Sequence, residues 1–301
     1  MSRGHTLSEW DIACLQTMNI PEVTVLDYEP GEISESEAAI RIIQQAVCGS
    51  LEFQVQSGGS VAGVATDDCC VIVDVNALTM VNNTPGGVQI ATRPNFSFAA
   101  AGHKIVTAKS TPFVASARAV DEQQVLIGFN PLLQARPISG TVAVIYTHPV
   151  TPSITESMFY AVARTRLARC NIQSFFSSCV SETPESIAAE IAHWSSDPRV
   201  STILIASPTV PAGLSDPVGQ GMLLAQCSIE SFMAPVDPGS LLILGYYANL
   251  QIGHTVSVVA APGCWRQPKP NVLDIILPAL LSRYRFSAFE ISSLGIGGLL
   301  Q

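Results

Sequence analysis

From residue 137 to the end of the chain, strand-like apolar runs alternate with helix-like runs, and few folds accommodate such a pattern. TVAVIYT precedes SITESMFYAVARTRL, NIQSFFSSCV precedes PESIAAEIAHW, and STILIAS precedes a loop and VGQGMLLAQC. Repeated strand and helix units are typical of a parallel sheet with helices on both faces. We therefore predict an α/β fold for residues 137–301, a three-layer α/β/α arrangement around a mostly parallel sheet.

The first 136 residues have a different pattern and predict two further segments. Residues 1–50 are interpreted as a helical linker segment, in which the strand-like PEVTVLDYEP lies between two helices and Ser34 to Glu37 forms a helix-start signal. Residues 51–136 contain short runs rich in β-forming residues between turns, which is typical of a β-rich module. These runs are LEFQVQ, CCVIVDV, VQIATR, NFSFAA, KIVTAK and QVLIGF.

Composition argues against several classes of function. Apolar residues make up 48% of the chain and charged residues 13%, about half of the usual quarter, so we expect burial against a partner and a homo-oligomer. A net charge of -9 with 15 Lys plus Arg argues against nucleic-acid binding. Without a signal peptide or a long apolar stretch, the chain is expected to be cytoplasmic and not bound to a membrane. The five histidines lack the spacing of a metal site.

Polar loops follow several of the predicted strands. In an open parallel sheet, ligands bind outside the carboxyl ends of the strands, where helix N-termini present amide groups. Thr147 is the last residue of TVAVIYT, Ser207 is the last residue of STILIAS, and Pro262, Gly263 and Cys264 follow TVSVVAA. Thr147 and Ser207 also fit helix or turn caps. Cys264 fits either a thiol whose pKa is lowered by a helix N-terminus or an ordinary structural cysteine.

Two Pro-Gly turns carry further polar residues. In PVDPG, Asp237 is compatible with a turn in which it accepts from backbone amides. Arg266, Lys269 and Asn271 cluster at the start of the apolar run NVLDIILPALL, in a chain with few cations. A phosphate held there would gain about 1.5–3 kcal/mol for each charge-assisted hydrogen bond. A solvated helix start is the alternative, and the glycine-rich SLGIGGLL predicts a terminal strand or packed tail because no helix follows it.

The order of these motifs resembles the molybdopterin-binding family, whose α/β domain occurs in molybdopterin molybdotransferases and in proteins related to molybdenum-cofactor nucleotidyltransferases. PVDPGSLLILG, followed by APGCWRQPKPNVLDIIL and SLGIGGLL, is similar to the family's Pro-Gly loop and pterin-phosphate loop, with Lys269, Asn271 and Asp274 at matching positions. RGHTLSEWDIACLQTMNIPEVTVLDYEPGEISESEAA is similar to the family's linker, and IATRP with KIVTAKSTPFV resembles its β-rich module. The resemblance covers nearly the whole chain and implies a molybdopterin-binding-like α/β domain after a β-rich module.

Two loops depart from the family's pattern. Where molybdotransferases usually have T-G-D/N-E after the first strand, this chain has THPV at residues 147–150. The family's glycine-serine loop ending in Asp corresponds to ASPTVPAGLSD, in which Ser207 and Asp216 match. The resemblance implies that the carboxylates of these two family loops hold a divalent cation and molybdate. Their loss from this chain would affect catalysis more than pterin binding.

The resemblance implies a cytoplasmic molybdopterin-binding protein in molybdenum-cofactor biosynthesis, maturation or delivery, with molybdopterin as ligand or substrate. One alternative is an active, Mg²⁺-dependent molybdopterin molybdotransferase with Asp216 and Asp237 as catalytic residues and Asp216 as metal ligand. Another is a structural partner of a molybdenum oxidoreductase or nucleotidyltransferase. The residues expected to bind the cofactor are Thr147, Ser207, Asp237, Gly239, Pro262, Gly263, Arg266, Lys269 and Asn271.

Overall fold

The computed structural model describes residues 5–56, 58–110, 114–148, 152–209, 211, 213–250, 253–267 and 269–300, with the backbone alone for residues 152–158. The chain divides into two compact units. The N-terminal unit comprises Met1–Thr66, Val71–Asn95 and Ala101–Ala135, and the C-terminal unit comprises Asp67–Cys70, Phe96–Ala100 and Arg136–Gln301. The boundaries of these units differ from those of the expected segments, because two short pieces of the predicted β-rich module belong to the C-terminal unit.

The N-terminal unit combines helices with small sheets. Its helices are α1 (Glu9–Thr17), α2 (Glu35–Ala46), α3 (Val75–Asn82) and α4 (Ala117–Ile127). An antiparallel sheet has the order β3 (Leu51–Val55), β4 (Val61–Ala65), β8 (Lys104–Ser110), β6 (Val88–Thr92). β1 (Glu32–Ser34) pairs antiparallel with β9 (Val114–Ser116). β2 (Val47–Gly49) pairs parallel with β10 (Leu133–Pro137), and two further strands are β5 (Cys69–Val73) and β7 (Ser97–Ala99), the latter wholly in the C-terminal unit.

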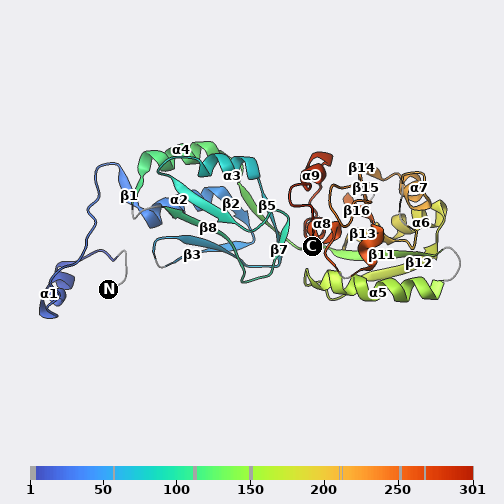
Figure 1. Ribbon diagram of the computed structural model, residues 1–301, viewed down its shortest axis with the longest axis horizontal. Helices are drawn as coiled ribbons and strands as arrows, with labels where there is room; N and C mark the ends of the chain where they lie inside the picture. The colour runs from blue at the N-terminus through green and yellow to red at the C-terminus, as the bar shows by residue number, and fades with distance from the viewer. Residues whose placement is uncertain are drawn as a thin grey trace. The chain divides into compact units, whose positions relative to one another are not determined.

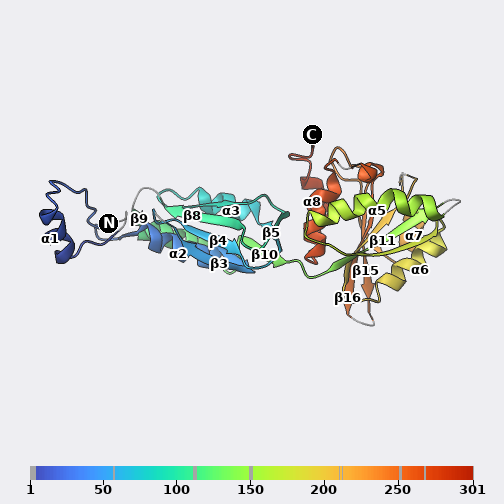
Figure 2. The same ribbon diagram turned by 90° about the horizontal axis from the view of Figure 1, so that it is seen from below.

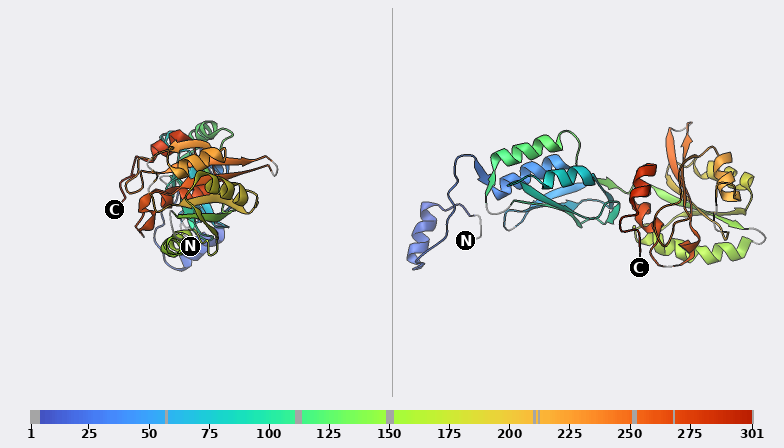
Figure 3. Two further views of the ribbon diagram at one scale, coloured as in Figure 1. Left: turned by 90° about the vertical axis from the view of Figure 1, so that its right-hand side faces the viewer. Right: turned by 45° about the horizontal axis from the view of Figure 1, so that its top comes forward.

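Helix α2 provides much of the core of this unit. Its hydroxyl cap is the predicted one, since Ser34 Oγ accepts from the Glu37 amide at 3.1 Å. The apolar face formed by Ala39, Ile42 and Ile43 is fully buried. Helices α2, α3 and α4 lie on the same side of the β3-β4-β8-β6 sheet (Figure 1; Figure 3, right).

Two strand predictions in the N-terminal unit are wrong. QVLIGF lies largely in helix α4, because Ser116 caps the helix and Ala119, Val120, Gln123 and Ile127 are buried at helical spacing. PEVTVLDYEP forms no strand, and its residues are exposed. β-forming residues make a strand only where a neighbouring strand pairs with them, and this described stretch has no such pairing.

The C-terminal unit is built on one six-stranded sheet. Its order is β12 (Phe176–Ser181), β11 (Thr141–His148), β13 (Val200–Ala206), β16 (His254–Ala260), β15 (Ile243–Asn249), β14 (Ser228–Phe232). The first four strands are parallel, whereas β15 pairs antiparallel with both β16 and β14 (Figure 2). The predicted α/β class is confirmed, with several sheets that include both parallel and antiparallel pairs. Its helical elements are α5 (Pro152–Ala168), α6 (Pro184–Trp194), α7 (Pro217–Leu224), the short 3-10 helix η1 (Gly263–Arg266), α8 (Val272–Leu281) and α9 (Ala288–Ser293).

Alternate residues of β11 face different helices. Ile145 belongs to an apolar cluster with Ile187 and Ile191 of α6. The ring of the next residue, Tyr146, stacks on Phe159 of α5 with centroids 6.3 Å apart. Helices α5 and α6 therefore lie against opposite faces of this sheet (Figures 1 and 2). In the part of the chain that the structure describes, no helix is long and apolar enough to cross a bilayer.

Candidate functional site

The loops that carry the predicted site residues meet at one edge of the six-stranded sheet. The strand register pairs Tyr146 with Ala206, Ile205 with Ala260, and Ala260 with Ile243. The carboxyl ends of β11, β13 and β16 and the amino end of β15 are therefore level with one another. The segments after residues 148, 206 and 260, and the PVDPGS segment before β15, all begin at this edge.

The two Pro-Gly loops are in direct contact. Gly239 has a φ of +122°, and a Cβ atom added to it would lie 2.8 Å from Cγ1 of Val272 and 2.9 Å from its nitrogen. Gly239 is therefore required where the first loop packs on the start of α8. The C-terminal tail holds the same loop from another side, through hydrogen bonds of the Asp237 backbone with Gly298 and Leu300 at 2.7 Å each. The tail SLGIGGLL is thus held to this loop through its backbone and the buried Gly298, whereas Ile296 and Leu299 are exposed.

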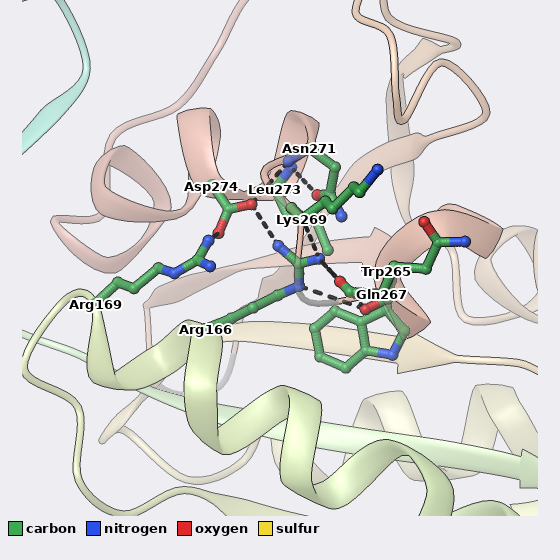
Figure 4. A network of polar contacts seen from close by, with 8 residues as sticks. All are labelled: Arg166, Arg169, Trp265, Gln267, Lys269, Asn271, Leu273 and Asp274. Carbon is green, nitrogen blue, oxygen red and sulfur yellow. Dashed lines mark hydrogen bonds and ion pairs between the residues drawn. The ribbon is translucent and has the colours of Figure 1, made fainter. Parts of the chain in front are cut away.

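A buried arginine that the sequence analysis did not single out organises the second loop. Arg166 of α5 is 1% exposed and donates to the carbonyl oxygens of Trp265, Gln267 and Lys269, the last at 3.0 Å (Figure 4). It also forms an ion pair with Asp274 of α8. The loop therefore turns its carbonyl groups inward around one guanidinium. The sequence contained a signal for this arginine, because ARTRLAR has three arginines in a chain of few cations.

Asp274 connects this arginine to the start of α8. Its carboxylate accepts from Arg169 at 2.6 Å and from the Asn271 amide at 2.8 Å. Asn271 Oδ1 in turn accepts from the Leu273 amide at 2.9 Å, which completes a capping box. A phosphate placed directly on the first-turn amides, as the sequence analysis expected, would compete with these side chains. Any anion bound here must use donors other than the Leu273 amide.

Such donors are present in the loop. Among the described residues, neither the Trp265 indole nitrogen nor Asn271 Nδ2 has a hydrogen-bond partner, although both atoms are buried. Trp265 is 2% exposed and Asn271 is fully buried. Buried donors without a partner are uncommon in folded proteins and call for a ligand or an ordered water. The loop thus holds two N–H groups that can receive an acceptor.

The predicted cations lie on the outside of the loop. Arg266 and Lys269 are exposed, and Arg266 Nε donates to the Gly263 carbonyl at 3.3 Å. Pro262 is buried and Gly263 half-buried beneath them. Figure 4 shows the Lys269 side chain on the same side of the α8 start as the Asn271 amide. The ends of both cations therefore point to solvent, while Arg166 holds the loop from inside.

A second polar cluster follows β12 and β13. Ser207 Oγ donates to Glu182 Oε1 at 2.9 Å, and Thr209 Oγ1 donates to the same oxygen. Thr147, fully buried at the end of β11, has no partner for Oγ1 among the described residues. Glu182 was not predicted as a site residue, because the prediction used only the segments at the ends of three other strands. The same rule applied to NIQSFFSSCV would have found it.

The two aspartates named for catalysis and metal binding lie in different loops. Asp216 precedes α7 and accepts from the Gly213 amide at 3.0 Å, and Asp237 is exposed. The described residues contain no group of three or more His, Cys, Asp or Glu that could hold a metal ion. Magnesium binds through one or two carboxylates together with water and ligand phosphates, so a magnesium ion here would depend on single carboxylates and on the ligand. Pro149 and Val150 of the departed loop lie outside the described residues.

Cys264 is not an activated thiol. Burial raises the pKa of the thiol, and the charges of Asp237 and Asp274 raise it further, while Arg166 lowers it. The suggestion that a helix N-terminus lowers the pKa of Cys264 is therefore wrong. The interpretation as a structural cysteine agrees with this direction.

Alkylation rates test this assignment of Cys264. Because the thiolate is the reactive form, we expect iodoacetamide to modify Cys264 more slowly than glutathione near neutral pH, with a rate that rises on going to alkaline pH. Peptide mapping by mass spectrometry measures the rate at this one cysteine. Faster modification of Cys264 than of glutathione would contradict the raised pKa.

Comparison with known proteins assigns neither a family nor a function to this chain. No protein-family model matches the chain, and no curated protein is significantly similar to it in sequence. The argument for function therefore depends on the motifs and on the geometry of this edge.

Proposed function

We propose that this chain is a cytoplasmic molybdopterin-binding protein that acts in the biosynthesis, maturation or delivery of the molybdenum cofactor. In this proposal the C-terminal unit is a molybdopterin-binding-like domain, with three layers and its ligand at the carboxyl edge of the sheet. The motif order suggests the ligand. The observation that carries the proposal is the pair of buried, unpartnered donors, Trp265 Nε1 and Asn271 Nδ2, in the loop that resembles a pterin-phosphate loop.

The chemistry of the loop suits an anion with acceptor atoms. Arg166, Arg169, Arg266 and Lys269 bring four positive charges to the η1–α8 region, against the two negative charges of Asp237 and Asp274. Such a local excess of positive charge attracts a phosphate even in a chain with a net charge of -9. Lys269 and Arg266 would bind the phosphate, and the buried donors would bind oxygen or ring nitrogen atoms of the ligand.

Two other residues give this site its shape. Gly239 allows the first Pro-Gly loop to pack on Val272, and Asp237 lies in that loop where it can orient the pterin. Thr147 and Ser207, at the ends of β11 and β13, form another wall of the same edge. Pterin and dithiolene chemistry would come from the ligand, while these residues hold and orient it.

Removal of the two exposed cations tests the proposal. We expect the Arg266→Ala/Lys269→Ala variant to bind molybdopterin roughly tenfold to a hundredfold more weakly than the unmodified protein, because charge-assisted hydrogen bonds at an exposed site contribute little more than 1 kcal/mol each. Anaerobic titration, followed by pterin fluorescence, measures the dissociation constants.

A matched control removes one arginine and one lysine elsewhere. Lys104 and Arg118 are exposed residues of the N-terminal unit, so the Lys104→Ala/Arg118→Ala variant has the same net charge as the test variant. It is expected to bind as the unmodified protein does. Equal, weak binding by all three proteins would refute the phosphate site.

The alternatives predict different results in the same preparation. An active molybdotransferase inserts molybdate into bound molybdopterin when Mg²⁺ is added, and Asp216→Asn would reduce that rate. A structural partner of a molybdenum oxidoreductase or nucleotidyltransferase would copurify with that enzyme and carry no pterin. Because this chain has THPV where molybdotransferases usually have T-G-D/N-E, we favour binding without catalysis.

A further inference from the structure

Glu182 is a half-buried carboxylate whose two oxygens have different surroundings. Oε1 accepts from the hydroxyl groups of Ser207 and Thr209. These hydroxyls also lie 2.8 Å from each other, and the Thr209 amide donates to Ser207 Oγ at 3.0 Å. Because a carboxylate oxygen has two lone pairs in its plane, Oε1 is saturated. The hydroxyl pair therefore fixes the orientation of the carboxylate.

Oε2 is buried and has no partner among the described residues. A buried carboxylate oxygen without a hydrogen bond is costly, and its persistence requires an explanation. Thr147 Oγ1, on the neighbouring strand, is also buried without a partner. A ligand that supplies hydrogen-bond donors at this point would satisfy the acceptor that the fold leaves open.

The charge of Glu182 restricts what that ligand can present. A carboxylate repels phosphate and accepts from N–H groups. The described residues place no group of three or more His, Cys, Asp or Glu side chains at this carboxylate. The end of the ligand that reaches Oε2 is therefore a neutral or positive N–H donor.

We propose that Glu182 selects the 2-amino group of the pterin ring, at the opposite end of the ligand from the phosphate. This inference rests on the proposed function. The Glu182 carboxylate lies 2.9 Å from Ser207 Oγ, directly after β13, and β13 neighbours β16, so the carboxylate is within about two strand spacings, or roughly 10 Å, of the loop after β16. A bicyclic ring with a short phosphate-bearing side chain can extend across that distance.

A pair of ligands that differ at one position tests this role. The phosphate monoesters of 6-hydroxymethylpterin and 6-hydroxymethyllumazine differ in having an amino or an oxo group at ring position 2. We expect the unmodified protein to bind the pterin ester roughly tenfold or more tightly. In Glu182→Gln, the amide oxygen can accept from Ser207 and Thr209 while the NH₂ group replaces Oε2. The preference should therefore reverse toward the lumazine ester.

Two further variants separate this role from a structural one. Glu182→Asp keeps the charge but shortens the side chain, so we expect the preference to be lost without reversal. Glu185→Gln makes the same charge change at an exposed position in the first turn of α6 and should bind as the unmodified protein does. Inorganic phosphate should compete equally well in all folded variants. Circular dichroism establishes that they are folded.

Each result distinguishes this inference from the proposed function. Reversal in Glu182→Gln with a normal Glu185→Gln supports the inference. If the unmodified protein binds both esters equally, or if Glu182→Gln retains the pterin preference, Glu182 does not select the amino group, while pterin binding itself stands. If the unmodified protein binds neither ester, both proposals are overturned.

Discussion

Replacement of Arg166 by methionine is expected to destabilise the C-terminal unit by about 3 kcal/mol, the lower end of the cost of breaking a buried ion pair. Methionine preserves much of the apolar stem but donates no hydrogen bonds. The carbonyls of Trp265, Gln267 and Lys269 would lose their common donor. Asp274 would retain its ion pair with Arg169. The expected loss of stability therefore stays below the largest cost of breaking a buried ion pair. Urea unfolding in a Trp10→Phe/Trp194→Phe background, with Trp265 as the fluorescent reporter, measures the change.

The neighbouring Arg164 offers a matched control for this variant. Arg164 is an exposed residue of the same helix, and Arg164→Met should change the unfolding free energy by about 0.5 kcal/mol or less. Arg166→Lys should recover only part of the stability, because an ammonium cannot reproduce the planar fork of a guanidinium. If Arg166→Met and Arg164→Met were equally stable, the loop would not depend on Arg166.

Gly239→Ala is expected to cost about 2–6 kcal/mol in stability and to abolish ligand binding at the edge. Two effects add: a φ of +122° strains a residue with a side chain by about 1–3 kcal/mol, and overpacking costs a similar amount. The new methyl group would contact both a side-chain atom and the backbone nitrogen of Val272. The two Pro-Gly loops would have to move apart. Thermal unfolding and ligand titration on the same preparation measure both consequences.

The Gly297→Ala variant separates the cost of backbone strain from the cost of steric overlap. Gly297 has a φ of +80°, and a Cβ atom there would have nothing within 4 Å. This variant should lose about 1–2 kcal/mol from backbone strain alone and should bind ligand normally. Similar losses in the two variants would mean that contact between Gly239 and Val272 contributes nothing.

Periodicity in the sequence predicted most elements of the C-terminal unit, but strand β14 and helix α9 were not predicted. Alternation of apolar strands with helices predicted the α/β class, because each pattern is local and repeats at its own period. QVLIGF was misassigned because six apolar residues do not distinguish a strand from the end of a helix. PEVTVLDYEP has the residues of a strand, but pairing is a property of the neighbour and cannot be read from the run itself.

The candidate site was partly predictable for the same reason. Polar residues immediately after strands, such as Thr147 and Ser207, were found because the topology of a parallel sheet brings strand ends together. Arg266 and Lys269 were found because cations are few in this chain. Glu182 follows strand β12, so the rule that polar residues at strand ends form the site would also have predicted it.

Periodicity and loop composition alone establish the fold class and predict that the candidate residues lie at one edge of the sheet, since both follow from patterns local to the chain. They do not reveal that a buried Arg166 holds the loop after β16, or that Gly239 packs on Val272. Those contacts join residues 33 and 108 positions apart, Gly239 to Val272 and Arg166 to Asp274. Sequence spacing carries no information about such pairs, because helix packing and strand order bring them together only in the folded chain.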